Sequence, residues 1–290
     1  VLDEALQFNT GLLGVAPLAA YRIGECSYFL NDSKEASVEL ERFVKDYPNH
    51  DLAEWGWQYL GESRLTLKDA AGAAQAFEVV LKLKTDEPEQ IEAKFHLARA
   101  YEAMGQDDKA AELYEQVAAT NHPRATEALF GRATAEYESG KFDVAFKTFD
   151  DLLTRFPKST LQPDAQLNAG YCLYQLKNFA EARKYFEGAA ASKTNELNAT
   201  FWIGMCHESQ SDWDGAVKVF ETLSPKIPAV EPPAKEYELG AKTMYYWAES
   251  ESRLKNYDSA QQKFLAVGKQ WPKCRLVENS HYSAALAALQ

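Results

Sequence analysis

The most constraining feature of this sequence is a nine-residue pattern that returns along the chain. The pattern has an aromatic residue near its start, an alanine at its centre and an aromatic residue at its end, as in KFDVAFKTF (141–149), NFAEARKYF (178–186), DWDGAVKVF (212–220) and NYDSAQQKF (256–264). Three weaker copies lie upstream: DSKEASVEL (32–40), DAAGAAQAF (69–77) and QDDKAAELY (106–114). Copies in register are typical of a chain built from one repeated structural unit.

The spacing of the copies predicts two helices per unit. The central alanines, which follow one another at intervals of 37, 37, 35, 37, 34 and 44 residues, are Ala36, Ala73, Ala110, Ala145, Ala182, Ala216 and Ala260. This is close to the ~34-residue period of helix-turn-helix solenoids. Twelve residues before each alanine lies a second small residue, at Gly24, Gly61, Ala98, Ala133, Gly170, Gly204 and Ala248. Small residues allow two helices to approach closely. In four of the units a proline is expected to end the second helix, at Pro48, Pro157, Pro228 and Pro272.

These features make the sequence resemble the tetratricopeptide repeat family over about residues 17–274. That family has a small residue at position eight of each unit, alanine at twenty, an aromatic residue at twenty-four and proline at thirty-two. The segments AAYRIGEC (19–26), GWQYLGES (56–63) and ATFWIGMC (199–206) are similar to its first helix. Position eleven departs from the family, because Arg64, Glu136 and Glu251 replace the usual aromatic residue. The resemblance implies an all-α fold, a right-handed solenoid of about seven helical hairpins plus a terminal helix.

The two ends and one irregular gap define the expected domain organisation. Residues 1–16 are expected to be a partial preceding helix or an N-terminal cap, 17–274 the repeat solenoid, and 275–290 a capping or truncated-repeat helix. The longest interval contains SPKIPAVEPPAKEYELG (224–240), whose four prolines favour an extended chain. We expect this insertion to project as a loop, and we favour a tolerated insertion over a binding epitope.

The composition argues against nucleic-acid binding and against a membrane span. With 43 acidic and 31 basic residues the chain has a formal net charge of −12, the wrong sign for neutralising phosphates. No stretch reaches the ~18 apolar residues that a spanning helix requires. We therefore expect no nucleic-acid partner and no membrane span in this chain.

The sequence also shows no pattern typical of catalysis or metal binding. Cys26, Cys172 and Cys206 each lie two residues after the small residue at position eight, where other units have serine or alanine. We interpret these cysteines as space-filling residues and not as metal ligands or disulfide partners. The histidines are scattered, and neither CxxC nor HExxH spacing occurs. We expect a non-enzymatic protein without a cofactor or metal.

The resemblance implies that positions two, five, nine, twelve and thirteen of each first helix line a concave, peptide-binding surface. The aromatic candidates there are Tyr21, Tyr28, Phe95, Phe130, Tyr137, Tyr171, Tyr174, Phe201 and Tyr245. The acids are Glu25, Glu62, Glu92, Glu102, Glu127, Glu138, Asp164, Glu208 and Glu249, against the bases Arg99, Lys242 and Arg253. We take Glu25, Glu62 and Glu249 with the aromatic set as partner-binding candidates. The alternative is that position five packs between helices.

From this surface we hypothesise a protein-interaction scaffold that binds a basic and apolar protein segment. The family version that captures a C-terminal carboxylate has lysine at position five and asparagine at nine, and no unit carries either, which argues against that function. The rival hypothesis is an architectural module that assembles a larger complex through its ends or convex face. Further repeats or a second copy would then contact the ends.

A narrower resemblance concerns the compartment. The runs YRIGE (21–25) and FWIG (201–204), with YP or FP at unit ends, are similar to two bacterial envelope proteins. These are the periplasmic repeat protein of the Tol-Pal system and the repeat lipoprotein of outer-membrane protein assembly. The resemblance implies a periplasmic or envelope-associated scaffold, and a cytoplasmic location is the alternative.

Overall fold

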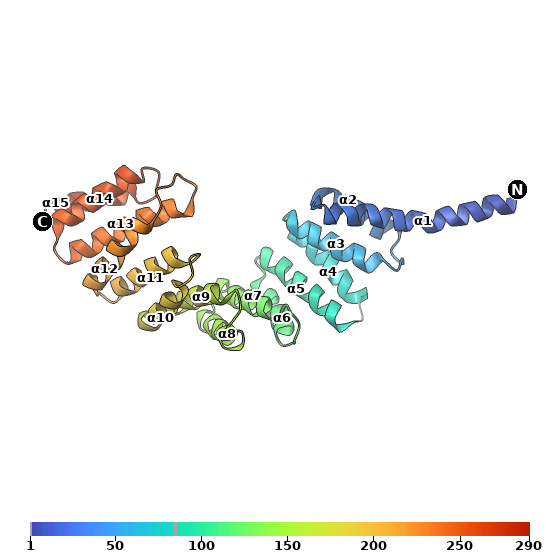
Figure 1. The fold of residues 1–290 in the computed structure, drawn as a ribbon, viewed down its shortest axis with the longest axis horizontal. Helices are drawn as coiled ribbons and strands as arrows, with labels where there is room; N and C mark the ends of the chain where they lie inside the picture. Colours follow the sequence, from blue (N-terminus) through green and yellow to red (C-terminus); the bar gives the residue numbers. More distant parts are fainter. Residues whose placement is uncertain (1, 84–85) are drawn as a thin grey trace. The chain divides into compact units, whose positions relative to one another are not determined.

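The computed structural model describes residues 2–83 and 86–290, and for residues 2–14 and 87 it describes the helix but not the side chain. Within these residues the chain forms fifteen α-helices, one 3-10 helix and no strand (Figure 1). The α-helices are α1 (Leu2–Phe29), α2 (Ser33–Asp46), α3 (Ala53–Thr66), α4 (Ala70–Leu83), α5 (Glu87–Ala103), α6 (Asp107–Ala118), α7 (Ala125–Glu138), α8 (Phe142–Arg155), α9 (Gln162–Gln175), α10 (Phe179–Ala189), α11 (Glu196–Ser209), α12 (Trp213–Leu223), α13 (Lys235–Arg253), α14 (Tyr257–Gln270) and α15 (Val277–Ala288). Odd-numbered helices up to α13 are the first, or A, helices of the predicted pairs, and even-numbered helices are the B helices.

The chain divides into two compact units, residues 1–141 (unit 1) and 142–290 (unit 2). In unit 1 each helix from α1 to α7 packs against the next, and the A helices α1, α3, α5 and α7 also contact their neighbours. In unit 2 each helix from α8 to α15 packs against the next, and α11 contacts α13. This consecutive packing of helices confirms the predicted all-α repeat fold.

The repeat signature forms the core of each unit. All seven central alanines are fully buried. A Cβ added to Gly170 would lie 2.6 Å from Phe186 Cε1, and one added to Gly61 would lie 2.7 Å from Phe77 Cζ. The missing side chain at position eight thus makes room for the large residue at position twenty-four of the same hairpin.

Each turn between an A and a B helix contains one residue with positive φ, five positions before the central alanine. These residues are Asn31, Lys68, Gly105, Gly140, Lys177, Ser211 and Lys255, with φ between 59° and 75°. Only glycine adopts this left-handed conformation at no cost, so five of the seven turns carry a non-glycine residue under mild strain. After three of these turns an aspartate caps the B helix: Asp32 accepts from the Glu35 amide, Asp69 from the Gly72 amide and Asp212 from the Gly215 amide.

Ion pairs replace the aromatic contact that position eleven lacks. Arg64 Nη2 lies 3.0 Å from Glu41 Oε2, and Arg132 Nε donates to Glu136 at 2.8 Å. Glu251 accepts a hydrogen bond from Asn256 Nδ2 at 2.7 Å. The departures from the family pattern are therefore compensated by polar contacts.

The irregular stretch 224–240 differs from the projecting loop that its prolines predicted. It begins with a 3-10 helix (Ser224–Lys226), and Ile227 and Val230 then pack against the core of unit 2. Its last six residues are helical and form the start of α13, where Tyr237 is buried. Burial of these apolar side chains holds the stretch against the repeats.

The ends of the chain are helical. Residues 2–16 belong to α1, which continues through Pro17 as the first A helix. After the last pair, α15 packs against α14. None of the helices in the described ranges is long and apolar enough to cross a membrane.

Candidate functional site

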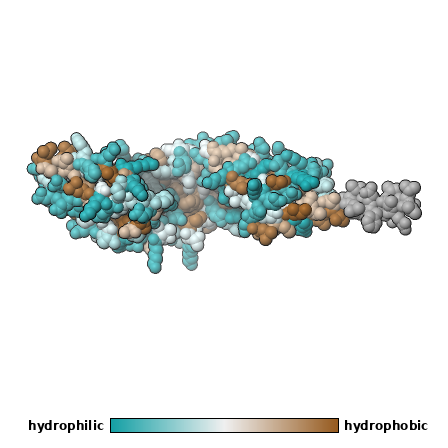
Figure 2. Space-filling model, turned by 90° about the horizontal axis from the view of Figure 1, so that it is seen from above, coloured by the Kyte–Doolittle hydropathy of each residue, from teal (hydrophilic) through white to brown (hydrophobic). Residues whose placement is uncertain are grey.

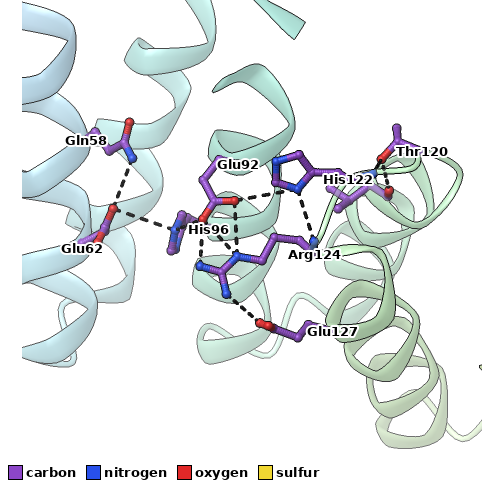
Figure 3. Close-up of polar contacts among 9 residues, drawn as sticks. Gln58, Glu62, Glu92, His96, Thr120, His122, Arg124 and Glu127 are labelled. Carbon is purple, nitrogen blue, oxygen red and sulfur yellow. Dashed lines mark hydrogen bonds and ion pairs between the residues drawn. The ribbon is translucent and has the colours of Figure 1, made fainter. Parts of the chain in front are cut away.

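Unit 1 carries a network of charged side chains on its A helices (Figure 3). Arg124, at the start of α7, donates through Nε and Nη2 to Glu92 Oε1 of α5 at 3.0 and 2.9 Å. Its Nη1 donates to Glu127 at 2.8 Å, and its guanidinium lies over the ring of Phe95. His96 and Arg124 lower the pKa of Glu92 to about 2. Glu92 and Glu127 are therefore neutralised within the chain.

His96 extends this network to α3. The ring is buried, and Nε2 lies 3.4 Å from Glu92 Oε1 and 3.8 Å from Glu62 Oε1. Glu62 also accepts hydrogen bonds from Gln58 Nε2, at 3.4 Å, and from the hydroxyl of Tyr28 on α1. Burial and the bond to Glu62 raise the pKa of Tyr28. Within the described part of the chain, no lysine or arginine pairs with Glu62.

A cavity of about 440 Å³, the Glu62 pocket, opens beside this carboxylate. It is lined by Tyr28, Phe29, Asn31, Ser33, Glu62, Leu65, Thr66, His96 and Arg99, from α1, α2, α3 and α5 and the first turn. The ring of Tyr28 stacks on Tyr59 with centroids 4.5 Å apart. Aromatic walls beside a carboxylate provide the contacts that ammonium and guanidinium groups favour.

In unit 2 two tyrosines of α9 form hydrogen bonds with α11, the next A helix. Asn198 Nδ2 of α11 donates to the Tyr171 hydroxyl of α9 at 2.6 Å, and the hydroxyls of Tyr174 and Ser209 lie 2.9 Å apart. Both tyrosine rings contact the edge of Trp202, with centroids 5.2 and 4.8 Å away. These side chains hold neighbouring repeats together.

A second cavity, of about 540 Å³, lies between α11 and the start of α13. We term it the lysine-rimmed cleft, and it is lined by Leu167, Lys193, Thr194, Asn195, Leu197, Asn198, Phe201, Trp202, Lys235, Glu236, Glu238, Leu239 and Lys242. Asn195 is buried and donates to Asp164 at 2.8 Å, which fixes one wall. The cleft combines apolar side chains with three ammonium groups.

Unit 2 also holds two acids close together on α11 and α13. Glu208 accepts a hydrogen bond from Ser250 at 3.3 Å. Burial, with a smaller effect of the Glu249 charge, raises the pKa of Glu208 to about 7. This carboxyl therefore changes charge near neutral pH.

The structure separates the predicted binding residues into two groups. Tyr21, Phe95 and Phe201 are buried, with 3%, 5% and 5% of their surfaces exposed, so their rings serve mainly as packing between helices. This corrects their assignment to an open surface, and it agrees with the packing alternative for position five. Glu25 is also engaged, because it pairs with Arg22 and accepts from the Tyr21 hydroxyl at 2.9 Å.

The other candidates retain partial exposure. Tyr28 and Glu62 meet at the Glu62 pocket, and Tyr171 and Tyr174 meet at Trp202. Partial exposure is shared by Phe130, Tyr137, Tyr245 and Glu249. Tyr245 packs edge-on against Phe264, and Glu249 lines a third cavity with Arg253, Tyr257 and Leu286. The structure therefore shows local sites within each unit.

Sequence reasoning missed Arg124, Lys193 and Lys235 as residues of these sites, and it missed the buried His96 of α5. Arg124 and Lys193 lie in connections between successive repeats, and Lys235 lies in the stretch that was expected to loop out. No lining position of the repeat includes these four residues, so the fold was needed to find them.

Two of the three cysteines that we interpreted as space-filling have the environment of structural residues. Cys172 and Cys206 are buried, whereas Cys26 is exposed, so the space-filling interpretation is wrong for Cys26. Burial raises the pKa of Cys206 to about 12, which disfavours the reactive thiolate.

Comparison with known proteins supports the repeat assignment. Family profiles described as tetratricopeptide repeat match residues 18–50, 95–160 and 160–196. No curated protein sequence matches the chain significantly.

The fold is similar to several solved structures. The C-terminal part of a TPR repeat-containing protein from Cytophaga hutchinsonii has 15% identity and a TM-score of 0.72, over 90% of this chain and 98% of that one. A tetratricopeptide repeat protein from Parabacteroides merdae has 15% identity and a TM-score of 0.59, over 93% and 98%. A MamA fragment from Desulfovibrio magneticus has 15% identity and a TM-score of 0.53, over 66% and 96%.

The helical hairpins, the buried alanine of every unit and these matches agree with one another. The chain has the tetratricopeptide repeat fold, and residues 18–50 and 95–196 match profiles of that family.

Proposed function

We propose that this chain is a non-enzymatic scaffold that binds a basic and apolar protein segment at the Glu62 pocket of unit 1. Repeat proteins of this family bind protein partners, which supports the general class of function. The observation that carries the specific proposal is the state of Glu62. Its carboxylate faces an open cavity with aromatic walls and has no lysine or arginine partner among the described residues.

The chemistry of the pocket favours a lysine or arginine side chain. A cation over Tyr28 or Phe29 gains ~0.5–2 kcal/mol, depending on how much water is removed. Phe29 is 64% exposed and offers apolar surface for a neighbouring residue of the partner. Arg99 also lines the pocket, and its charge repels a cation, so the attraction must come from Glu62 and the aromatic rings.

Two synthetic dodecapeptides test this proposal: one alternates lysine with leucine and the other alternates glutamate with leucine. Fluorescence anisotropy of labelled peptides would give each affinity for the full chain. In Glu62→Gln the amide oxygen can still accept from Tyr28, so mainly the charge is lost. We expect the affinity for the lysine peptide to fall by about fivefold.

Glu112→Gln is the matched control, since Glu112 is exposed on the B helix α6 and the change in net charge is identical. We expect its affinity to change by less than about twofold. Equal losses in the two variants would mean that the lysine peptide responds only to overall charge, and the proposal would fail.

The architectural alternative has its own supporting observation. Large apolar side chains are exposed near both ends of the chain, at Val15, Leu18, Phe29, Leu30, Tyr282, Leu286 and Leu289. In Figure 2, hydrophobic residues are visible among the hydrophilic residues that make up most of this face. Such surfaces support contact with further repeats or a second copy. Concentration-dependent self-association in sedimentation, lost in Leu286→Ser with Leu289→Ser, would favour this function.

For the compartment we propose the bacterial envelope. The proposal is supported by the similarity of YRIGE (21–25) and FWIG (201–204) to envelope repeat proteins. Fractionation of the native producing cells tests it, and recovery in the cytoplasm would contradict it.

A further inference from the structure

We propose that the lysine-rimmed cleft of unit 2 binds an acidic protein segment that carries apolar residues. This site lies apart from the Glu62 pocket, and it reverses the charge preference of the proposed function.

The cleft exists because α13 begins early. α13 has 19 residues, whereas α9 and α11 have 14 each. The additional residues come from the stretch 224–240 and place Lys235, Glu236 and Leu239 along the cleft. The opposite wall is the connection before α11, with Lys193 and Thr194. An insertion that interrupts the repeat period therefore forms a wall of this cavity.

The side chains of the rim leave positive charge available. Lys193, Lys235 and Lys242 are exposed, and the described residues form no ion pair with any of them. Nearby Lys226, in contrast, donates to Glu196 at 2.7 Å. Two carboxylates, those of Glu236 and Glu238, share the cleft with the three ammonium groups. The lysines thus outnumber the acids there, in a chain whose net charge is −12.

The interior of the cleft fits an apolar side chain. Leu197, Leu239 and Trp202 are partly buried and contribute to the same hydrophobic cluster. Phe201 lies edge-on to Trp202 with centroids 5.8 Å apart, which keeps the indole in place. A cavity of about 540 Å³ accommodates a few side chains of an extended segment. Leucine or phenylalanine would enter the interior while flanking Asp or Glu meets the lysines.

The test uses the full chain and the glutamate-leucine dodecapeptide, measured by fluorescence anisotropy. Lys235→Gln with Lys242→Gln removes two rim charges. Because both side chains are exposed, the helix content should not change. We expect the dissociation constant of the acidic peptide to rise about tenfold. The control, Lys147→Gln with Lys218→Gln, changes two exposed lysines of the B helices α8 and α12, and we expect a change below about twofold.

The outcomes separate this proposal from that for unit 1. Glu62→Gln should leave the acidic peptide unaffected, and the rim variant should leave the lysine peptide unaffected, so either proposal can fail alone. Equal effects of the rim and control variants on the acidic peptide would overturn the cleft proposal. It would also be overturned if the acidic peptide did not bind and the rim variant abolished self-association, since the cleft would then be an interface between copies.

Discussion

Units 1 and 2 are built from the same repeat but satisfy the charges of their A helices differently. In unit 1 Arg22 and Arg124 neutralise Glu25, Glu92 and Glu127, which leaves Glu62 as an acid facing an open cavity. In unit 2 the lengthened α13 adds Lys235, which no repeat position predicts, to a cleft that Lys242 of a lining position also borders. The number of charged residues at lining positions therefore does not show where a charged partner binds. That depends on which of these charges remain without an ion-pair partner in the folded chain.

The largest expected effect tests whether the two sites depend on separate cores. Phe220 is fully buried in unit 2 and contacts Gly204, next to Phe201 of the cleft. Phe220→Ala should cost ~3–5 kcal/mol and loosen unit 2. We expect binding of the acidic peptide to be lost while the lysine peptide still binds.

Phe77→Ala in unit 1 is the reciprocal variant, because Phe77 is fully buried and stacks on His96. It should abolish binding of the lysine peptide and spare the acidic peptide. Loss of both peptides in both variants, with urea unfolding in one transition, would show that the units fold as one and would break the comparison.

A smaller effect concerns pH, to which the two units should respond in opposite directions. The pKa of Glu208 is raised to about 7, so its native state binds more protons than the unfolded state between about pH 4.5 and 7. The stability of unit 2 should therefore fall as the pH rises through this window and then level off. Glu208→Gln should remove this loss and stabilise the protein at pH 8 by about 1–2 kcal/mol, since partial contact with water limits the effect.

Glu92 provides the contrast in unit 1. Its pKa is lowered to about 2, so its contribution is present above about pH 4.5 and is lost as the pH falls towards 2. Urea unfolding across the pH range would check both slopes. If the free energy of unfolding of Glu208→Gln still fell between pH 5 and 7 as steeply as that of the wild type, another group would cause the fall.

The smallest effect concerns the strained turns. Lys177 of unit 2 has a φ of 60°, and the equivalent residue in the α7–α8 turn of unit 1 is Gly140. Lys177→Gly should relieve strain and increase the free energy of unfolding by ~0.5–1 kcal/mol, which raises the melting temperature. Gly140→Lys should lower stability by a similar amount. If calorimetry showed that Lys177→Gly destabilises the protein and Gly140→Lys stabilises it, the turn conformation would not limit stability.

The periodic positions explain what could be predicted from the sequence. Ala182 and Gly170 recur in register because helix packing demands small residues there, and this sufficed to predict the hairpins. Position five was ambiguous, because an aromatic residue such as Phe201 suits packing as well as binding. Arg124 and Lys235 could not be placed, because they lie outside the repeat positions and their neighbours come from other helices.

The most direct test of the account is whether both peptides bind one molecule together. The protein is saturated with unlabelled glutamate-leucine peptide, and labelled lysine-leucine peptide is then titrated at physiological ionic strength, in the wild type and in the Lys235→Gln, Lys242→Gln variant. The two peptides attract each other, so their mutual affinity is measured without protein and is included as a separate equilibrium when the titration is fitted. We predict one bound copy of each peptide per chain, with the affinity of the lysine peptide unchanged by the acidic one. Competition between the peptides for one site would contradict the assignment of two separate sites of opposite charge preference.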